Sequence, residues 1–200
     1  MGKAEQTRKH IIEKASSIMN VKGISGTSVE EILDSAKVAR GCLYGHFKTK
    51  EDLAVACAEY LLETLKGERV SHLGKYSSAK DKLFHYLSGH KKAFKTPIPG
   101  GCPILNLSTE ADDTNPVINK MVRKNIDSYL LLFTELLHQG VDQGEFTADL
   151  QPDEFALKMF TSIEGALMVC QVKNSTKPML VIIESLRKEL LTYCITETVN

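Results

Sequence analysis

Apolar residues recur along this chain every three or four positions, which is the period of a helix with one buried face. No sustained alternation of apolar and polar residues, the pattern of a β-strand, interrupts this period. The expected fold class is therefore all-α: a three-helix helix-turn-helix head is followed by a larger helical body, with about nine helices in total. These helices are expected over residues 4–22, 27–36, 40–47, 49–66, 79–95, 103–113, 116–143, 153–173 and 177–196.

Local start and stop signals mark the ends of the N-terminal helices. Gly23 predicts a C-cap for the first helix. Thr27, followed three residues later by Glu30, predicts a capping box at the start of the second helix. Thr49, with Asp52 at the third helical position, predicts an N-cap for the fourth helix.

Charge is unevenly distributed along a chain whose formal net charge is zero. Residues 1–50 hold nine Lys or Arg and five Asp or Glu, a net charge of +4, and the remaining residues carry −4. A basic head on an acidic body fits a protein whose head alone meets a polyanion. We expect the first domain over residues 1–48 and the second over residues 49–200.

The five cysteines are scattered, odd in number and without a C-x-x-C spacing. This pattern argues against a disulfide framework or a zinc site, and it fits a reducing cytoplasm. The charged N-terminus lacks the apolar region of a secretion signal. No run approaches the roughly 18 uninterrupted apolar residues of a membrane-spanning helix. We therefore expect a cytoplasmic protein with no metal, no cofactor and no membrane association.

The most informative motif lies near the N-terminus. Its residues are Thr7, Arg8, Ile11, Ile12, Ala15, Gly23, Thr27, Ser28, Val29, Ile32, Ala36, Val38, Gly41, Leu43, Tyr44, His46, Phe47, Lys50, Asp52 and Leu53. At this spacing they resemble the DNA-binding head of the TetR family of bacterial transcriptional regulators, over about a quarter of the chain. The resemblance implies a nine-helix homodimer whose last two helices form the subunit interface and whose body holds a small-molecule effector.

The segment over residues 40–47 also has the physical character of a recognition helix. A helix of about two turns, anchored from behind by Leu43 and Phe47, is small enough to enter a DNA major groove. Arg40 can offer a bidentate fork to guanine, and Cys42 can pack on a thymine methyl group. With the phosphate contacts that the resemblance implies, we expect double-stranded DNA to be bound by Thr27, Ser28, Lys37, Arg40, Gly41, Cys42, Tyr44, His46 and Lys50.

Three positions depart from the usual pattern of the family. Lys37 stands where the turn usually has glycine, and it costs about 1 kcal/mol if the position needs a positive φ. Ala39 replaces the usual serine at the N-cap of the third helix, so that cap is lost. Cys42 replaces a hydroxyl-bearing residue. These departures leave open a helical module that binds a small molecule or a partner and has little DNA affinity.

The body is expected to provide an effector pocket and a dimer interface. The resemblance places the pocket among the fourth to eighth helices, and its expected lining is Tyr60, His90, Cys102, Asn106, Tyr129 and Met159. The last two helices are apolar on more than one face, which predicts a second copy of the chain as partner. The expected dimer contacts are Phe160, Leu167, Cys170, Ile183, Leu186 and Leu190. Glu164 is expected to face solvent or a dimer contact.

Two further alternatives concern Cys102. It precedes Pro103 at a helix start, where the helix dipole lowers a thiol pKa, so a redox- or electrophile-sensing regulator stays open. An all-helical enzyme would use Cys102, His90 or Glu110, but no nucleophile or phosphate-loop motif supports one. The leading hypothesis is a non-enzymatic, ligand-responsive, dimeric DNA-binding regulator. It would be a repressor released from a palindromic operator by an unidentified small molecule.

Overall fold

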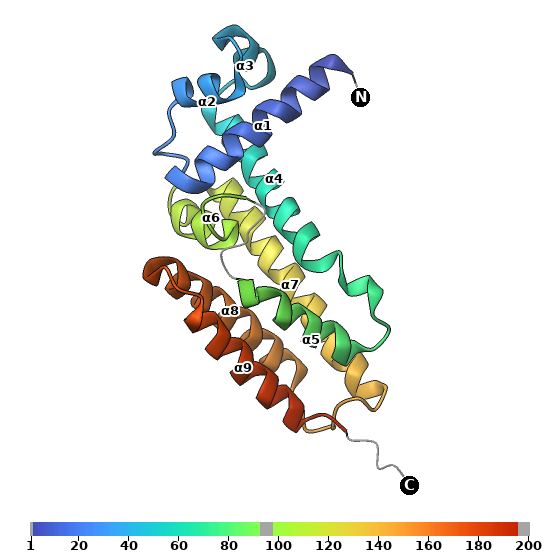
Figure 1. Ribbon diagram of the computed structural model, residues 1–200. Helices are drawn as coiled ribbons and strands as arrows, with labels where there is room; N and C mark the ends of the chain where they lie inside the picture. The colour runs from blue at the N-terminus through green and yellow to red at the C-terminus, as the bar shows by residue number, and fades with distance from the viewer. Residues whose placement is uncertain (1, 93–97, 196–200) are drawn as a thin grey trace. The chain divides into compact units, whose positions relative to one another are not determined.

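The computed structural model describes residues 2–92 and 98–195, and this part of the chain is all-α, as expected (Figure 1). Its elements are α1 (Lys3–Lys22), α2 (Val29–Ala36), α3 (Arg40–His46), α4 (Lys50–Val70), η1 (Leu73–Lys75), α5 (Ala79–Gly89), η2 (His90–Lys92), α6 (Pro103–Ala111), α7 (Pro116–Asp142), α8 (Pro152–Lys173) and α9 (Lys177–Thr192). The only β-pairing in these residues is an isolated antiparallel bridge between Phe146 and Cys194. The expected ends of two helices, at residues 95 and 196, lie outside the described residues.

The chain packs as two compact units. The first comprises Met1–Lys66 with Thr96–Lys124, and the second comprises Gly67–Lys95 with Asn125–Asn200. The first unit therefore contains α1–α3 together with α6. The expected DNA-binding domain boundary after residue 48 stays a prediction, because packing does not show which segment contacts DNA.

The core of the first unit fixes the short helices of the head. Its residues, each at most 3% exposed, include Ile11, Ala15, Met19, Ile32, Ala36, Leu43, Phe47, Leu53 and Leu61. The Arg8 guanidinium lies 5.0 Å from the centre of the Phe47 ring, which adds a cation–π contact between α1 and the end of α3. A ring nitrogen of His10 donates to the Ala36 carbonyl at 3.0 Å. α1 thus holds both α2 and the end of α3 in place.

In the second unit, α8 and α9 lie side by side (Figure 1). By length and composition α8 is able to cross a membrane, because an 18-residue window within Pro152–Lys173 has a mean hydropathy of 1.3. Half of that window is buried inside the chain, as in the core helix of a globular protein.

The expectation that Glu164 faces solvent or a dimer contact is wrong. Glu164 lies on the buried side of α8 and is 5% exposed. Its Oε1 accepts a hydrogen bond of 2.7 Å from Nη1 of Arg69, which lies in the last turn of α4. A carboxylate is found at such depth when a cation is paired with it. This ion pair also accounts for α4, which runs to Val70 rather than ending near Lys66 as expected.

Candidate nucleic-acid interface

α2 begins with a capping box, one residue later than the sequence pattern predicts. The Ser28 hydroxyl accepts from the Glu31 amide at 3.2 Å, and the Glu31 carboxylate accepts from the Ser28 amide at 2.9 Å. The expected pair of Thr27 with Glu30 is therefore wrong. Thr27 is 1% exposed, and its hydroxyl donates to the Gly23 carbonyl at 2.7 Å, so this side chain closes the preceding turn and is not available to a phosphate.

The turn between α2 and α3 confirms two of the expected departures. Lys37 has φ 53° and ψ 45°, which is the left-handed conformation that glycine adopts most easily. Ala39 makes no side-chain cap for α3. At the next helix start, the expected cap is present: the Thr49 hydroxyl accepts from the Asp52 amide at 3.0 Å, and the Asp52 carboxylate accepts from the Thr49 amide at 3.1 Å.

α3 has one buried and one exposed side. Leu43 and the following Phe47 are each 3% exposed and anchor the helix from behind, as expected. Gly41 and Gly45 lie one turn apart and are exposed, and a Cβ added at either position would meet nothing within 4 Å. The outer side of α3 is therefore low and unobstructed, so a DNA groove can approach the helix backbone closely.

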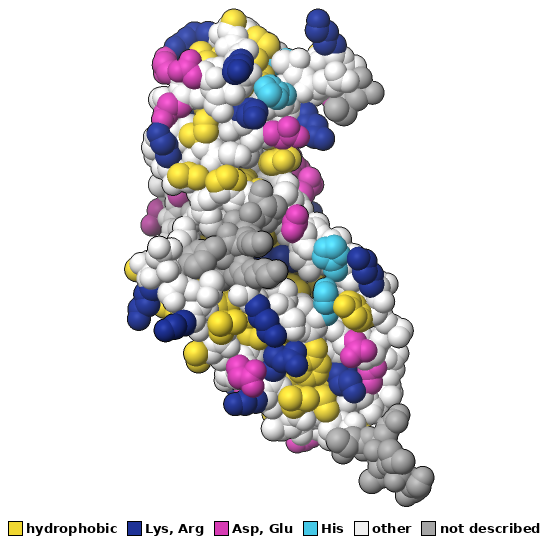
Figure 2. Space-filling model, viewed as in Figure 1, with side chains coloured by type: hydrophobic (Ala, Val, Ile, Leu, Met, Phe, Trp, Pro, Cys, Tyr) yellow, Lys and Arg dark blue, Asp and Glu magenta, His cyan; other side chains and the backbone are white. Residues whose placement is uncertain are grey.

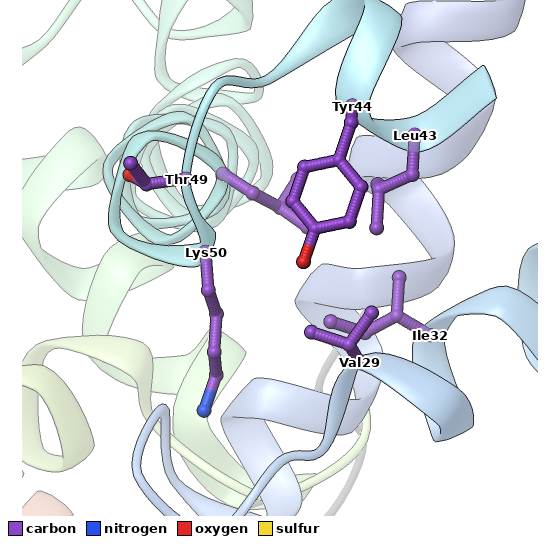
Figure 3. Close-up of a pocket in the computed structure, with 7 residues that line it drawn as sticks. Val29, Ile32, Leu43, Tyr44, Thr49 and Lys50 are labelled. Carbon is purple, nitrogen blue, oxygen red and sulfur yellow. The ribbon is translucent and has the colours of Figure 1, made fainter. Parts of the chain in front are cut away.

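Tyr44 projects from α3 over a small hollow that faces α2 and the start of α4 (Figure 3). The hollow measures about 10 Å³, room for about one water molecule. It is lined by Val29, Ile32, Leu43, Tyr44, Thr49, Lys50 and Leu53. In Figure 3 the Lys50 side chain extends on the same side as the Tyr44 ring. Tyr44 is 43% exposed, so its hydroxyl and the Lys50 ammonium are both suited to contact phosphate.

Arg40 has a partner within the protein. Its Nη2 pairs with Oε1 of Glu30 in the first turn of α2, and both side chains are more than half exposed. A hydrogen bond from the Glu30 backbone amide, and then the Arg40 guanidinium, hold the pKa of Glu30 below its usual range. Exposed pairs of this kind contribute little to stability. A guanine edge can therefore replace Glu30 as the partner of Arg40 at low cost.

The other predicted DNA contacts lie on this surface with different exposure. Ser28, Lys37, Arg40, Gly41 and Tyr44 are exposed, whereas Cys42, His46 and Lys50 are partly exposed. Glu30 was not among the predicted site residues. Its contact with Arg40 spans ten positions across a turn, so no helical i, i+4 spacing indicates it.

The six predicted effector contacts are divided between the two units. Tyr60, Cys102 and Asn106 belong to the first unit, and His90, Tyr129 and Met159 belong to the second. Asn106 is engaged elsewhere, because its amide nitrogen donates to Asn20 and Gly100. We therefore assign Asn106 to the joint between α1 and α6 rather than to an effector site. Cys102 is 2% exposed, which counts against a readily accessible sensor thiol.

Within the second unit, the predicted residues lie near the buried Arg69–Glu164 pair. The Arg69 guanidinium lies 5.9 Å from the centre of the Tyr129 ring. Tyr129 and Met159 are fully buried. Burial, and then the Arg69 charge, lower the pKa of His90 to about 4, so its ring is neutral near pH 7. This cluster combines aromatic surface with a few polar atoms, as small-molecule sites do.

The six predicted dimer contacts require a correction. Phe160, Leu167, Cys170, Ile183, Leu186 and Leu190 are at most 8% exposed within a single chain. They pack α8 and α9 into the core of their own protomer, which leaves them unable to cover a second copy. The apolar periodicity of the two helices marks this core as strongly as it would mark an interface.

A different set of residues forms the exposed side of α8 and α9. An open groove of about 500 Å³ is lined by Thr161, Ser162, Gly165, Ala166, Met168, Val169, Pro178, Val181 and Ile182. Met168, Val172 and Val181 are 54%, 83% and 66% exposed. Figure 2 shows hydrophobic side chains among charged ones over the region of α9. We call the surface formed by the groove and Val172 the α8–α9 face.

Metal binding finds no support within residues 2–92 and 98–195. Among these residues, no group of three or more His, Cys, Asp or Glu side chains is arranged to hold a metal ion. The candidate enzyme residues Cys102 and Glu110 belong to the first unit, and His90 belongs to the second. Both oxygens of the Glu110 carboxylate accept hydrogen bonds from backbone amides.

Comparison with known proteins agrees with this architecture. Residues 11–57 match the family model described as bacterial regulatory proteins of the tetR family. Residues 79–186, more than half of the chain, match the model described as the tetracyclin repressor-like C-terminal domain. The chain is 25% identical over 173 residues to the HTH-type transcriptional repressor DhaR of Mycobacterium sp. strain GP1, an alignment that covers 86% of each protein.

Solved structures show the same fold along almost the whole chain. A TetR transcriptional regulator from Chloroflexus aurantiacus is 29% identical, with a TM-score of 0.90 and coverage of 97% of this chain and 98% of that one. A TetR-family regulator from Cytophaga hutchinsonii is 28% identical, with a TM-score of 0.91 and coverage of 98% and 99%. With a helix-turn-helix at one end and a matching C-terminal domain behind it, the chain belongs to the TetR family of bacterial transcriptional regulators.

Proposed function

We propose that this regulator is a homodimeric repressor that leaves a palindromic DNA operator when a small-molecule effector binds. The observation that carries the proposal is the exposed side of α3, where Arg40 and Tyr44 flank two glycines that leave the helix surface low. In a dimer, each α3 would read one half of the operator, at a spacing of about 34–36 Å or a multiple of it.

Within this surface, the side chains divide into two roles. Arg40 would read a base, exchanging Glu30 for the O6 and N7 atoms of guanine. Ser28, Lys37, Tyr44, His46 and Lys50 would contact phosphates, which sets affinity more than sequence preference. Gly41 and Cys42 would allow α3 to approach the base edges. The roles differ in how strongly each depends on salt.

The proposal further assigns the dimer contact to the α8–α9 face. Gly165 allows close approach of a second backbone there, because a Cβ at that position would meet nothing within 4 Å. Replacing Val181 with Glu places a charge at the centre of this face, and we expect a protein that sediments as a monomer. Glu184→Val, an exchange of the opposite kind one turn further along α9, is the control that should leave the dimer intact.

The effector is proposed to bind in the second unit, close to His90, Tyr129, Met159 and the Arg69–Glu164 pair. The support is the burial of polar atoms among aromatic rings: Tyr129 lies 6.1 Å from both Phe133 and Phe160 between ring centres. Such a site can bias the protein between two states only through different affinities for them.

The decisive experiment selects duplexes from a random library with the purified full-length protein. We expect enrichment of a palindrome. Arg40→Ala should relax preference at one base pair of each half-site, whereas Lys50→Ala should weaken all duplexes about equally and flatten the salt slope by about one unit. Absence of any enriched sequence with the unmodified protein would contradict the proposed function.

A further inference from the structure

Glu110 in α6 binds the segment that links α1 to α2, which we call the α1–α2 connection (residues 23–28). Its Oε2 accepts a hydrogen bond from the Ile24 amide, and its Oε1 accepts one from the Ser25 amide, each at 2.8 Å. A carboxylate that accepts from two consecutive amides makes two charge-assisted hydrogen bonds. A side chain outside the helix-turn-helix thus fixes the backbone just before α2.

The α1–α2 connection is shaped to receive this carboxylate. Gly23 has φ 80° and ψ 161°, a conformation that essentially only glycine adopts. A Cβ at Gly23 would lie 3.2 Å from both Glu110 oxygens. From Gly23 the connection is closed by the Thr27 hydroxyl bond and passes into the Ser28 cap of α2. The position of the carboxylate therefore bears directly on where α2 begins.

A second set of contacts holds α6 to the end of α1. Asn106 Nδ2 donates to the carbonyls of Asn20 and Gly100, each at 2.9 Å. Asn20 is 5% exposed, and its own Nδ2 donates to the Pro99 carbonyl at 2.7 Å. Gly100 has φ 100°, and a Cβ there would lie 2.4 Å from the Asn20 carbonyl oxygen. The close fit leaves no room for a larger residue at that position.

We infer that Glu110 is a positioning residue for DNA recognition, an inference that rests on the proposed function. Its carboxylate sets the course of the α1–α2 connection, and so the place from which α2 and α3 start. Without it, the amides of Ile24 and Ser25 lose their partners, and the connection gains conformational freedom. DNA binding must then order this segment again, which lowers affinity although no DNA contact has been removed.

The test compares Glu110→Ala, Glu110→Gln and the control Asp113→Ala by fluorescence anisotropy, using a duplex selected by the wild-type protein. Asp113 is exposed just beyond α6 and makes no described hydrogen bond to the connection. Removing a negative charge by itself favours DNA binding, so simple electrostatics predicts tighter binding for both alanine variants. We instead expect Glu110→Ala to weaken binding at least tenfold, which corresponds to about 1.4 kcal/mol.

Two further readouts separate positioning from loss of fold or of a phosphate contact. The salt slope of Glu110→Ala should equal that of the wild type, because no cation has been removed. Hydrogen exchange at the amides of Ile24 and Ser25 should accelerate in the free protein. Glu110→Gln should fall between alanine and wild type, because its carbonyl oxygen still accepts one amide. A purely structural role would lower Tm without changing the affinity of the folded protein.

Wild-type affinity in Glu110→Ala, or an equal loss in Asp113→Ala, overturns the inference. If Glu110→Ala does not fold, Glu110→Gln decides: weakened binding with faster exchange supports the inference, and wild-type affinity overturns it. Failure of the wild type to select any duplex would instead overturn the proposed function. The two failures are therefore distinct.

Discussion

Lys37 is strained in the free protein, and its replacement by glycine is expected to raise stability. It occupies the left-handed region at φ 53° and ψ 45°, which costs a non-glycine residue about 1–2 kcal/mol. Glycine removes that cost, but its freedom in the unfolded chain offsets about 0.4–1 kcal/mol. We therefore expect Lys37→Gly to raise the free energy of unfolding by about 0.5–1 kcal/mol, the difference between these terms.

The same substitution is expected to weaken DNA binding. Lys37 is exposed in the turn that leads into α3, where a cation can reach phosphate. Loss of one phosphate contact flattens the plot of log affinity against log salt by about 0.9. Stability and DNA affinity should therefore change in opposite directions in a single variant.

Urea unfolding and salt-dependent fluorescence anisotropy measure the two effects, and two control variants separate their causes. Lys37→Ala removes the cation but keeps the strained backbone, so it should lose DNA affinity without gaining stability. Asn174, the C-cap of α8 at φ 46°, provides the opposite control. Asn174→Gly should change stability slightly and leave DNA affinity unchanged. Equal stability of the glycine and alanine variants at Lys37 would refute the reasoning.

Three other variants test separate parts of the structure. Ser28→Ala removes the α2 cap and should lower the free energy of unfolding by about 1 kcal/mol in urea titrations; an unchanged midpoint would argue against the cap. Glu164→Leu leaves Arg69 buried and unpaired and should cost about 3–5 kcal/mol, whereas adding Arg69→Met should recover much of that loss. Because the folded protein holds the pKa of His90 at about 4, below the ordinary 6.5, only the unfolded state gains this proton between those values. Stability should therefore fall as pH drops from about 6.5 toward 4, and His90→Gln should show a flatter pH profile.

The head could be predicted from sequence because its signals are local. Leu43 and Phe47 are spaced one helical turn apart, and both are buried as expected. The left-handed turn at Lys37 and the missing cap at Ala39 likewise follow from single positions. The one error of register, at Thr27, arose because Thr27–Glu30 and Ser28–Glu31 fit the same four-residue pattern. The buried Thr27 hydroxyl, bound to Gly23, decides between them.

The body could be predicted less well because its contacts join residues far apart in the sequence. The partners of Glu164 and Glu110 lie 95 and 86 positions away, at Arg69 and Ile24. Periodicity also cannot tell a helix side that packs within the chain from one that packs on another copy. For this reason Ile183 and Leu190 were assigned to the dimer contact, whereas their neighbour Val181 is the exposed residue.

The α8–α9 face has a consequence for how the regulator behaves at cellular abundance. A protomer alone exposes Met168, Val172 and Val181 to water, so covering them with a second copy would add free energy to the folded state. Thermal stability would then rise with protein concentration. At a few molecules per cell, occupancy of a two-fold site would depend on self-association as much as on contact with bases. The steepness of gene control would thus be set partly by a surface that never meets the operator.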